Sequence, residues 1–133
     1  MIYLLDTHTF IWAVLEPNKL GKKGKEIIIN KKNEIYVSSV SFWEISLKAS
    51  IKKFSFGNVN VKDFPKYARD MDFSVMDMQE NEAITFHELP PKKDHSDPFD
   101  RMLIWLAITK GLTLISKDKL FEQYREDGLK LTW

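Results

Sequence analysis

Apolar and polar residues occur in blocks along the chain, and each block has the pattern of a strand or a helix. Short, nearly continuous apolar runs predict strands that are buried on both faces. These runs lie at residues 1–5, 34–39, 73–76 and 111–116, and a weaker edge strand is predicted at 129–133. Segments with helical spacing lie between them, at residues 7–15, 20–32, 41–51, 60–71, 79–89, 98–110 and 118–127. The alternation predicts an α/β fold, a doubly wound parallel sheet of about four to five strands with helices on both faces.

Composition narrows the class of protein. A chain of 133 residues with 44% hydrophobic residues suits one domain, residues 1–133, with a core of its own. Cysteine is absent, which excludes disulfides and thiolate chemistry. No apolar run is long enough for a membrane span and no basic segment precedes Ile2, so we expect a cytoplasmic protein without a signal peptide. Lysines occur in clusters along the chain. We interpret these clusters as solvated helix faces, and the alternative is a row of positive charges that binds a phosphate backbone.

Four acidic residues follow the predicted strands or open the neighbouring helices. Asp6 directly follows the first strand, and Asp118 comes two residues after the fourth. Glu44 lies near the start of the helix after the second strand, and Asp100 opens the helix that leads into the fourth. Ligands of open parallel sheets bind at the carboxyl ends of the strands, and carboxylates gathered there repel one another unless a cation lies between them. Oxygen ligands without cysteine favour Mg²⁺ or Mn²⁺ over zinc.

The two aspartates of the stretch DPFD invite different interpretations. Asp97 precedes Pro98, which suits the first position of a helix, so Asp97 is a good N-cap. Asp100 then lies in the first turn, where an acid favours the helix dipole. Helical spacing also places Asp100 on an apolar flank, where a carboxylate requires a cation. We interpret Asp97 as the cap and Asp100 as the residue that faces a metal ion.

The other acids have structural explanations as well. Asp6 and Asp118 each fit the cap of the helix that follows them. Glu44 stands four residues before Lys48, the favourable orientation for an ion pair within a helix. Each explanation is sufficient for one residue alone, but four acids at matching edges of one sheet favour a shared site.

Four strings, YLLDTHTFIW, SVSFWEISLK, HSDPFDRMLI and LISKD, resemble in order and spacing the motifs of PIN-domain ribonucleases, most closely the VapC-type toxins of toxin–antitoxin pairs. The resemblance covers essentially the whole chain. It implies a Mg²⁺- or Mn²⁺-dependent endoribonuclease whose catalytic and metal-binding acids are Asp6, Glu44, Asp100 and Asp118. It also implies an RNA substrate, an antitoxin partner that lies across the site, and a homodimer, which is common in the family. One mild departure is Ser116, where relatives often have threonine.

Supporting roles are assigned to Asp97, Thr7, Ser39, Ser116 and Arg101. The hydroxyl groups are near the expected site and would orient water or a ligand, although a helix cap or a turn is the favoured explanation of serines in this setting. Arg101 is either a bidentate phosphate ligand or the partner of a nearby acid. The simpler interpretation of His8 and His95 is a surface or hydrogen-bonding histidine.

Two other classes of protein share parts of this pattern. A haloacid-dehalogenase-type phosphatase also begins with an apolar strand ending in an aspartate such as Asp6, but its second aspartate should stand where this chain has His8. A non-catalytic domain of the same fold that binds RNA or protein is the other alternative. Loss of one metal-binding acid would favour it, and all four are present.

Overall fold

The computed structural model describes residues 1–133, which form a five-stranded parallel sheet in the order β3-β2-β1-β4-β5. The strands are β1 (Ile2–Leu5), β2 (Glu34–Ser38), β3 (Ser74–Met76), β4 (Thr113–Ile115) and β5 (Lys130–Thr132). The α-helices are α1 (Thr7–Leu15), α2 (Lys22–Ile29), α3 (Ser39–Ser50), α4 (Phe64–Asp70), α5 (Glu80–Thr85) and α6 (Pro98–Lys110). Short 3₁₀ segments are η1 (Pro17–Lys19), η2 (Val61–Asp63), η3 (Phe86–Glu88) and η4 (Lys119–Asp127). The predicted parallel α/β sheet is confirmed.

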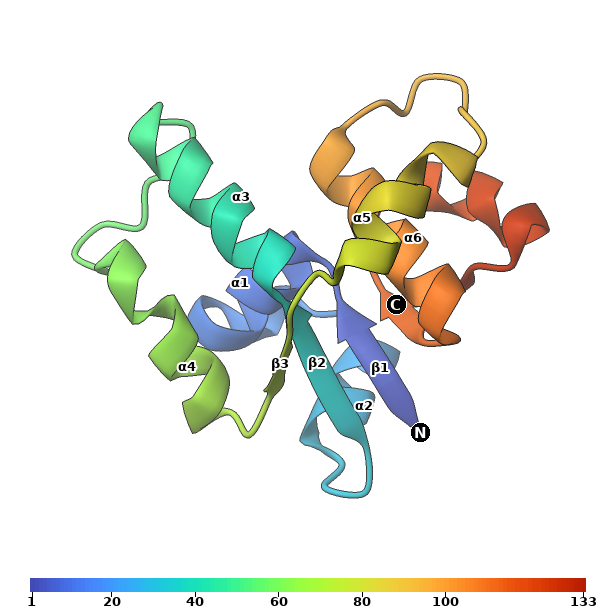
Figure 1. Ribbon diagram of the computed structural model, residues 1–133. Helices are drawn as coiled ribbons and strands as arrows, with labels where there is room; N and C mark the ends of the chain where they lie inside the picture. Colours follow the sequence, from blue (N-terminus) through green and yellow to red (C-terminus); the bar gives the residue numbers. More distant parts are fainter.

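Different helices cover the two faces of the sheet, because successive residues of a strand point to opposite sides. Leu4 and Leu114 pack in one hydrophobic cluster with Leu103 of α6. Leu5 packs in a second cluster with Phe10 of α1 and with residues of α4. Figure 1 shows α5 and α6 on one side of the strands, and α3 and α4 on the other. No helix is long and apolar enough to cross a membrane.

Helix α3 follows β2 without a loop and begins earlier than the sequence suggests. The pattern places its start at Ser41, whereas the helix begins at Ser39. The Oγ atom of Ser38, the last residue of β2, accepts a hydrogen bond from the backbone N–H of Val40 at 3.0 Å. This cap brings the first turn of α3 directly to the carboxyl end of the sheet, where the candidate site lies.

Three of the predicted helices have a different form in the structure. The helix expected at 79–89 divides into α5 and η3. The helix expected at 60–71 divides into η2 and α4, and Pro65 lies in the first turn of α4. The helix expected at 118–127 is the 3₁₀ segment η4. Phe121 and Tyr124 are its buried residues, and their spacing of three matches the three-residue repeat of a 3₁₀ helix, in which such side chains lie in line.

The carboxyl ends of the parallel strands meet at one edge, and the neighbouring segments begin there. Strand β1 lies at the centre, paired with β2 on one side and β4 on the other. Helix α1 starts after β1, α3 after β2, and η4 after β4. Helix α6 does not directly follow a strand. It precedes β4 in the chain, and it packs against α3. Figure 1 shows α3 and α6 on opposite sides of this edge of the sheet.

Candidate metal site

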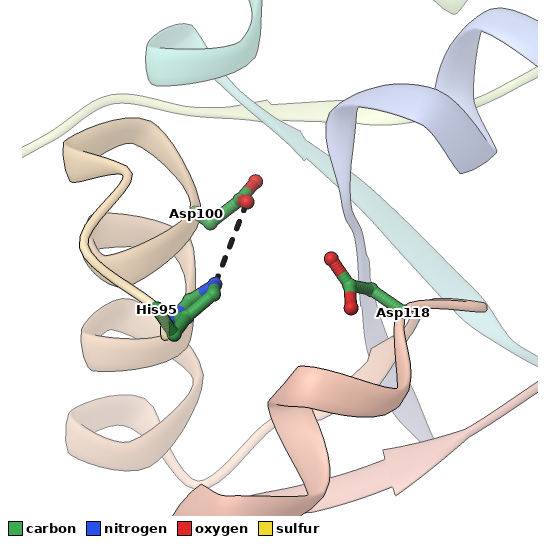
Figure 2. A group of neighbouring side chains, drawn as sticks. All are labelled: His95, Asp100 and Asp118. Carbon is green, nitrogen blue, oxygen red and sulfur yellow. Dashed lines mark ion pairs between the residues drawn. The ribbon is translucent and has the colours of Figure 1, made fainter. Parts of the chain in front are cut away.

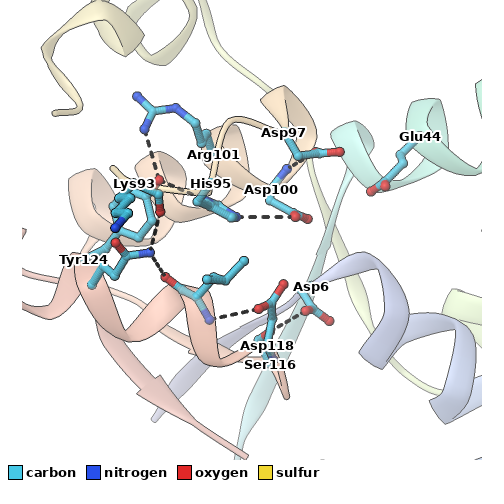
Figure 3. Close-up of polar contacts among 12 residues, drawn as sticks. Asp6, Glu44, Lys93, His95, Asp97, Asp100, Arg101, Ser116, Asp118 and Tyr124 are labelled. Carbon is cyan, nitrogen blue, oxygen red and sulfur yellow. Dashed lines mark hydrogen bonds and ion pairs between the residues drawn. The ribbon is translucent and has the colours of Figure 1, made fainter. Parts of the chain in front are cut away.

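Asp6 stands at the end of the central strand and is only 6% exposed. As the N-cap of α1, it accepts a hydrogen bond from the backbone N–H of Thr9 to Oδ1 at 2.8 Å. The hydroxyl of Ser116 donates to the other oxygen, Oδ2, at 2.5 Å, and the same hydroxyl oxygen accepts from the backbone N–H of Asp118 at 3.1 Å. Ser116 therefore links the segment after β1 to the segment after β4 (Figure 3).

Asp97 and Asp118 also cap the helices that follow them. Asp97 Oδ1 accepts from the backbone N–H of Asp100 at 2.9 Å, and Asp118 Oδ1 accepts from that of Leu120 at 2.9 Å. An ionised carboxylate has two oxygens and about four acceptor positions. Each cap uses Oδ1, which leaves Oδ2 free to bind an ion. The structural and the chemical explanations of these acids are therefore compatible.

Glu44 is the most deeply buried of the acids, with only 1% exposure. Its Oε2 atom pairs with the ammonium of Lys48 one turn later in α3, the ion pair that the spacing suggests. Its Oε1 atom is buried and has no hydrogen-bond partner. A buried carboxylate oxygen without a donor is costly, and a bound cation would satisfy it. The residues present therefore fit a metal ion.

The four candidate acids line one pocket of about 360 Å³ at the carboxyl edge of the sheet. The complete lining is Asp6, His8, Trp12, Glu44, Lys48, Asp100, Lys117 and Asp118. Asp100 is also shared by two closer groups that extend beyond this lining, Glu44–Asp97–Asp100 and His95–Asp100–Asp118, and within each group the ligand atoms lie within 4.8 Å of one another. Figure 2 shows the second group, with His95 and Asp118 on either side of Asp100. Asp6 belongs to neither group.

Burial, together with the crowding of carboxylates around Asp100, sets the electrostatics of the pocket. Burial, followed by the charges of Asp97 and Glu44, raises the pKa of Asp100 to about 8. Burial also raises the pKa of Asp6 above its usual value, although the hydrogen bonds from Ser116 and Thr9 oppose that shift. Both carboxyl groups therefore hold a proton more tightly than a free aspartate does. A divalent cation would reverse this preference by removing the repulsion.

Thr7 and Ser39, predicted as supporting residues, bind neighbouring segments and do not line the pocket. The Thr7 hydroxyl donates to Ser41 Oγ at 3.0 Å, which joins α1 to α3. Ser39 Oγ accepts from the backbone N–H of Met78 at 3.2 Å, which fixes the segment after β3. Both hydroxyls hold helices that carry candidate acids, and neither faces a ligand in this pocket.

Arg101 does not form the ion pair with an acid that its sequence position suggests. Its guanidinium donates to the carbonyl oxygens of Leu89 and Pro90, at 2.9 and 3.1 Å, and to the hydroxyl of Tyr124 at 3.0 Å. These bonds join residues 88–91, the ELPP segment, to α6 and η4. Arg101 is also absent from the lining of the acidic pocket, so the interpretation as a phosphate ligand is not supported.

Besides the predicted acids, His95 and two lysines lie at or beside the site. His95 is 5% exposed, and burial lowers its pKa. Its imidazole lies against Tyr124 and Phe121 of η4, with ring centroids 5.3 Å apart in both cases. Lys48 and Lys117 bring positive charge to the pocket wall. Of these three residues, only Lys48 has a signal in the sequence, which is its spacing from Glu44. His8 is exposed, as the sequence analysis expects.

Comparisons with known proteins agree with the fold and with the resemblance noted in the sequence. The model of the PIN domain family matches residues 3–127, so the chain belongs to the PIN domain family. Ribonuclease VapC22 of Mycobacterium tuberculosis (strain ATCC 25618 / H37Rv) is 24% identical over 130 residues, which are 98% of this chain and 97% of that protein. The family match decides against the haloacid-dehalogenase alternative.

Solved structures with the same fold include two VapBC complexes. VapBC2 from Rickettsia felis, bound to a DNA fragment from its promoter, gives a TM-score of 0.68 at 18% identity and covers 99% of this chain and 98% of that chain. DNA-bound VapBC from Salmonella typhimurium gives a TM-score of 0.67 at 21% identity and covers 99% of this chain and 98% of that chain. At this level of sequence identity, the similarity to these two structures shows a shared fold and nothing more.

Asp97→Asn tests the division of labour between the two aspartates of α6. Because asparagine caps a helix about as well as aspartate, we expect little change in melting temperature and only a several-fold loss of any metal-dependent activity. Thermal melting and initial rates, compared with Asp100→Asn, measure this difference. An equally large loss of activity in both variants would show that Asp97 and Asp100 are not distinct in role.

Proposed function

We propose that the protein is a metal-dependent endoribonuclease and the toxin of a toxin–antitoxin pair, and that residues 1–133 act as a single domain in the cytoplasm. The observation that carries the proposal is the convergence of Asp6, Glu44, Asp100 and Asp118 on one pocket that contains an unpaired, buried oxygen of Glu44. Membership of the PIN domain family and similarity to a protein named Ribonuclease VapC22 support the reaction class.

The proposed cofactor is Mg²⁺ or Mn²⁺, held by these four carboxylates. Hard divalent ions prefer oxygen ligands, and cysteine is absent from the chain. Such an ion would lower the pKa of a bound water and offset charge on the phosphodiester. Ser116 joins the carboxylate of Asp6 to the backbone at Asp118 and so connects the two sides of the site. No side chain is required as a covalent nucleophile.

A polyanionic substrate is supported by cationic residues on one flank of the acidic pocket. An adjoining pocket of about 320 Å³ shares Lys117 and Asp118 with it and is also lined by Lys23, Lys119 and Trp133. None of these three lysines forms a salt bridge within the chain, and Lys117 lies over the ring of Trp12, 5.9 Å from its centroid. Cations interleaved with aromatic rings suit the phosphates and bases of single-stranded RNA.

The other flank suits a protein partner. A pocket of about 480 Å³ shares His8 and Trp12 with the acidic pocket and is otherwise mainly apolar. Its apolar lining consists of Ile11, Trp12, Leu15, Phe54, Phe56 and Val59. We assign this flank to the cognate antitoxin, in keeping with the likeness to VapBC complexes. A homodimer belongs to the same proposal, and sedimentation of the purified protein tests it.

The test of activity is cleavage of a labelled, structured RNA with Mg²⁺, Mn²⁺ or EDTA, with Asp6→Asn as the control for contaminating nuclease. We expect cleavage by the wild-type protein in the presence of metal only, and none by the variant. Asparagine retains the N-cap and a hydrogen bond to Ser116, so the variant is expected to melt near the wild-type temperature.

Two other outcomes would contradict the proposal. Folded wild-type protein that cleaves no RNA in any metal would favour a non-catalytic binding module of the same fold. Equal cleavage by the wild-type protein and Asp6→Asn would attribute the activity to a contaminant or to a site elsewhere in the chain.

A further inference from the structure

His95 is a buried histidine whose two ring nitrogens face different groups. Nδ1 lies 2.7 Å from the hydroxyl oxygen of Tyr124. Nε2 lies 3.5 Å from Asp100 Oδ2 and has no hydrogen-bond partner within the usual limits. Figure 3 shows the imidazole between Tyr124 on one side and Asp100 on the other. His95 therefore lies between the buried Tyr124 and Asp100, the acid that belongs to both groups of candidate metal ligands.

The contacts of Tyr124 decide which nitrogen of His95 carries the proton. The guanidinium of Arg101 donates to the Tyr124 hydroxyl at 3.0 Å, and a guanidinium has no acceptor. The phenol oxygen thus accepts one bond, and its own hydrogen needs an acceptor. Tyr124 is fully buried, and Nδ1 of His95 is the remaining group that its hydroxyl contacts. If Nδ1 accepts this hydrogen, the ring proton of neutral His95 lies on Nε2, which points toward Asp100.

We infer that His95 is a hydrogen-bond donor that positions Asp100, and that it is not a ligand of the metal ion. The inference rests on the proposed function in so far as Asp100 holds an ion. The Arg101–Tyr124–His95 series holds Nε2–H toward Asp100 Oδ2, 3.5 Å away. A hydrogen bond across this gap would fix the rotation of that carboxylate and leave its other oxygen for the ion. Groups that orient a metal ligand in this manner affect metal affinity without touching the metal.

The alternative is that His95 binds the ion directly, together with Asp100 and Asp118, as their proximity would allow. Nε2 would then need a free lone pair, and the proton of the neutral ring would lie on Nδ1. Nδ1–H would donate to a phenol oxygen that already accepts from Arg101, and the buried phenol hydrogen would have no acceptor. An unsatisfied donor at a fully buried tyrosine is unfavourable, so the hydrogen-bond series favours the donor role.

The first experiment measures the tautomer of His95 in the wild-type protein. We would label the histidines with ¹⁵N, record long-range ¹H–¹⁵N correlations without metal and with saturating Mg²⁺, and assign His95 by its loss in His95→Gln. The expected result is a protonated Nε2 and an unprotonated Nδ1 in both conditions. A protonated Nδ1 and an unprotonated Nε2 in the Mg²⁺-bound protein would overturn the inference. This readout does not depend on RNA cleavage, so it remains decisive even if the proposed function fails.

The second experiment measures positioning through metal affinity, by titration of each protein with Mg²⁺ and Mn²⁺. His95→Phe retains a ring against Tyr124 and removes both nitrogens, and we expect it to weaken metal affinity by about 10- to 100-fold. His95→Gln retains an N–H near the position of Nε2, and we expect it to recover most of the affinity. Tyr124→Phe leaves His95 in place without its hydroxyl partner and should give an intermediate loss.

A merely structural role for His95 would give a different set of results. In that case His95→Phe and His95→Gln would lower the melting temperature of the metal-free protein, and the Kd for metal would remain unchanged in the folded fraction. Equal metal affinity of the wild-type protein and a folded His95→Phe variant would therefore overturn the positioning role. If His95→Phe does not fold, Tyr124→Phe decides in its place, by the same comparison of Kd.

Discussion

Asp100→Asn is expected to abolish metal-dependent RNA cleavage and, without metal, to raise the melting temperature at pH 8.5. Asp100 is shared by both groups of candidate ligands, and loss of its charge weakens every arrangement of an ion between them. Loss of several kcal/mol of charge stabilisation in the transition state corresponds to a decrease of about 1000-fold or more in rate. The gain in stability follows because the asparagine side chain carries no charge that is buried and none that repels Asp97 and Glu44. Single-turnover cleavage and thermal melting measure the two effects.

A matched control is Asp77→Asn, which makes the same chemical change at an exposed aspartate outside the acidic pocket. It should leave both cleavage and melting close to wild type, because surface substitutions of this kind change stability by about 0.5 kcal/mol or less. Cleavage by Asp100→Asn within a few-fold of the wild-type rate would exclude Asp100 from the metal site. Loss of cleavage together with a lower melting temperature would show instead that the carboxylate is needed for folding.

The metal-free protein is expected to become less stable as the pH rises from about 4 to about 8, and a divalent ion should remove this dependence. The pKa of Asp100 is raised from 3.8 to about 8 in the folded protein, chiefly by burial. Between these values the folded state keeps a proton that the unfolded state releases. The stability that this proton confers is fully present below the unfolded pKa and is lost as the pH rises through the folded pKa. Each pH unit within this window costs up to about 1.4 kcal/mol.

An ion that binds only the folded state acts in the opposite direction. At 100 times its Kd, such an ion adds about 2.7 kcal/mol of stability, or about 10 °C in Tm for a domain of this size. Melting curves at pH 6 and pH 8.5, with EDTA and with Mg²⁺, measure both effects. The increase with Mg²⁺ should be larger at pH 8.5, which is above the pKa of about 8 of Asp100, so that this carboxylate is mostly ionised. A metal-free protein that melts at the same temperature at both pH values would contradict the raised pKa.

The positions of the acids along the chain made much of this arrangement predictable. Asp6 and Asp118 follow apolar runs, and the parallel order of the strands brings the ends of such runs to one edge. The capping patterns at Asp97 and Asp118 are equally local, because each depends on residues within one turn. The roles of these acids in metal binding and catalysis remain part of the proposal.

The role of His95 was not predictable, because its surroundings are distant in the sequence. It lies in the polar stretch KKDHSD, which has no periodicity that would indicate burial. Phe121 and Tyr124 of η4 bury its ring, and they come more than twenty residues later in the chain. The contacts of Arg101 were not predictable for a similar reason, since its acceptors include the carbonyl oxygens of Leu89 and Pro90, which no side-chain pattern indicates. Local sequence signals do not contain such tertiary contacts.

The hydrogen bond between Ser116 and Asp6 joins residues 110 positions apart, and it has a consequence for the synthesis of the protein. Asp6 leaves the ribosome early, whereas Ser116 and Asp118 follow after all the other candidate acids. Strand β4 is one of the two neighbours of the central strand β1 and is also synthesised late. Strand β1 therefore has only one of its neighbours until β4 has been made. A growing chain therefore lacks a complete acidic site until almost the whole domain has been translated. A nuclease assembled in this order would have no complete site for attacking RNA while most of its own message is being read.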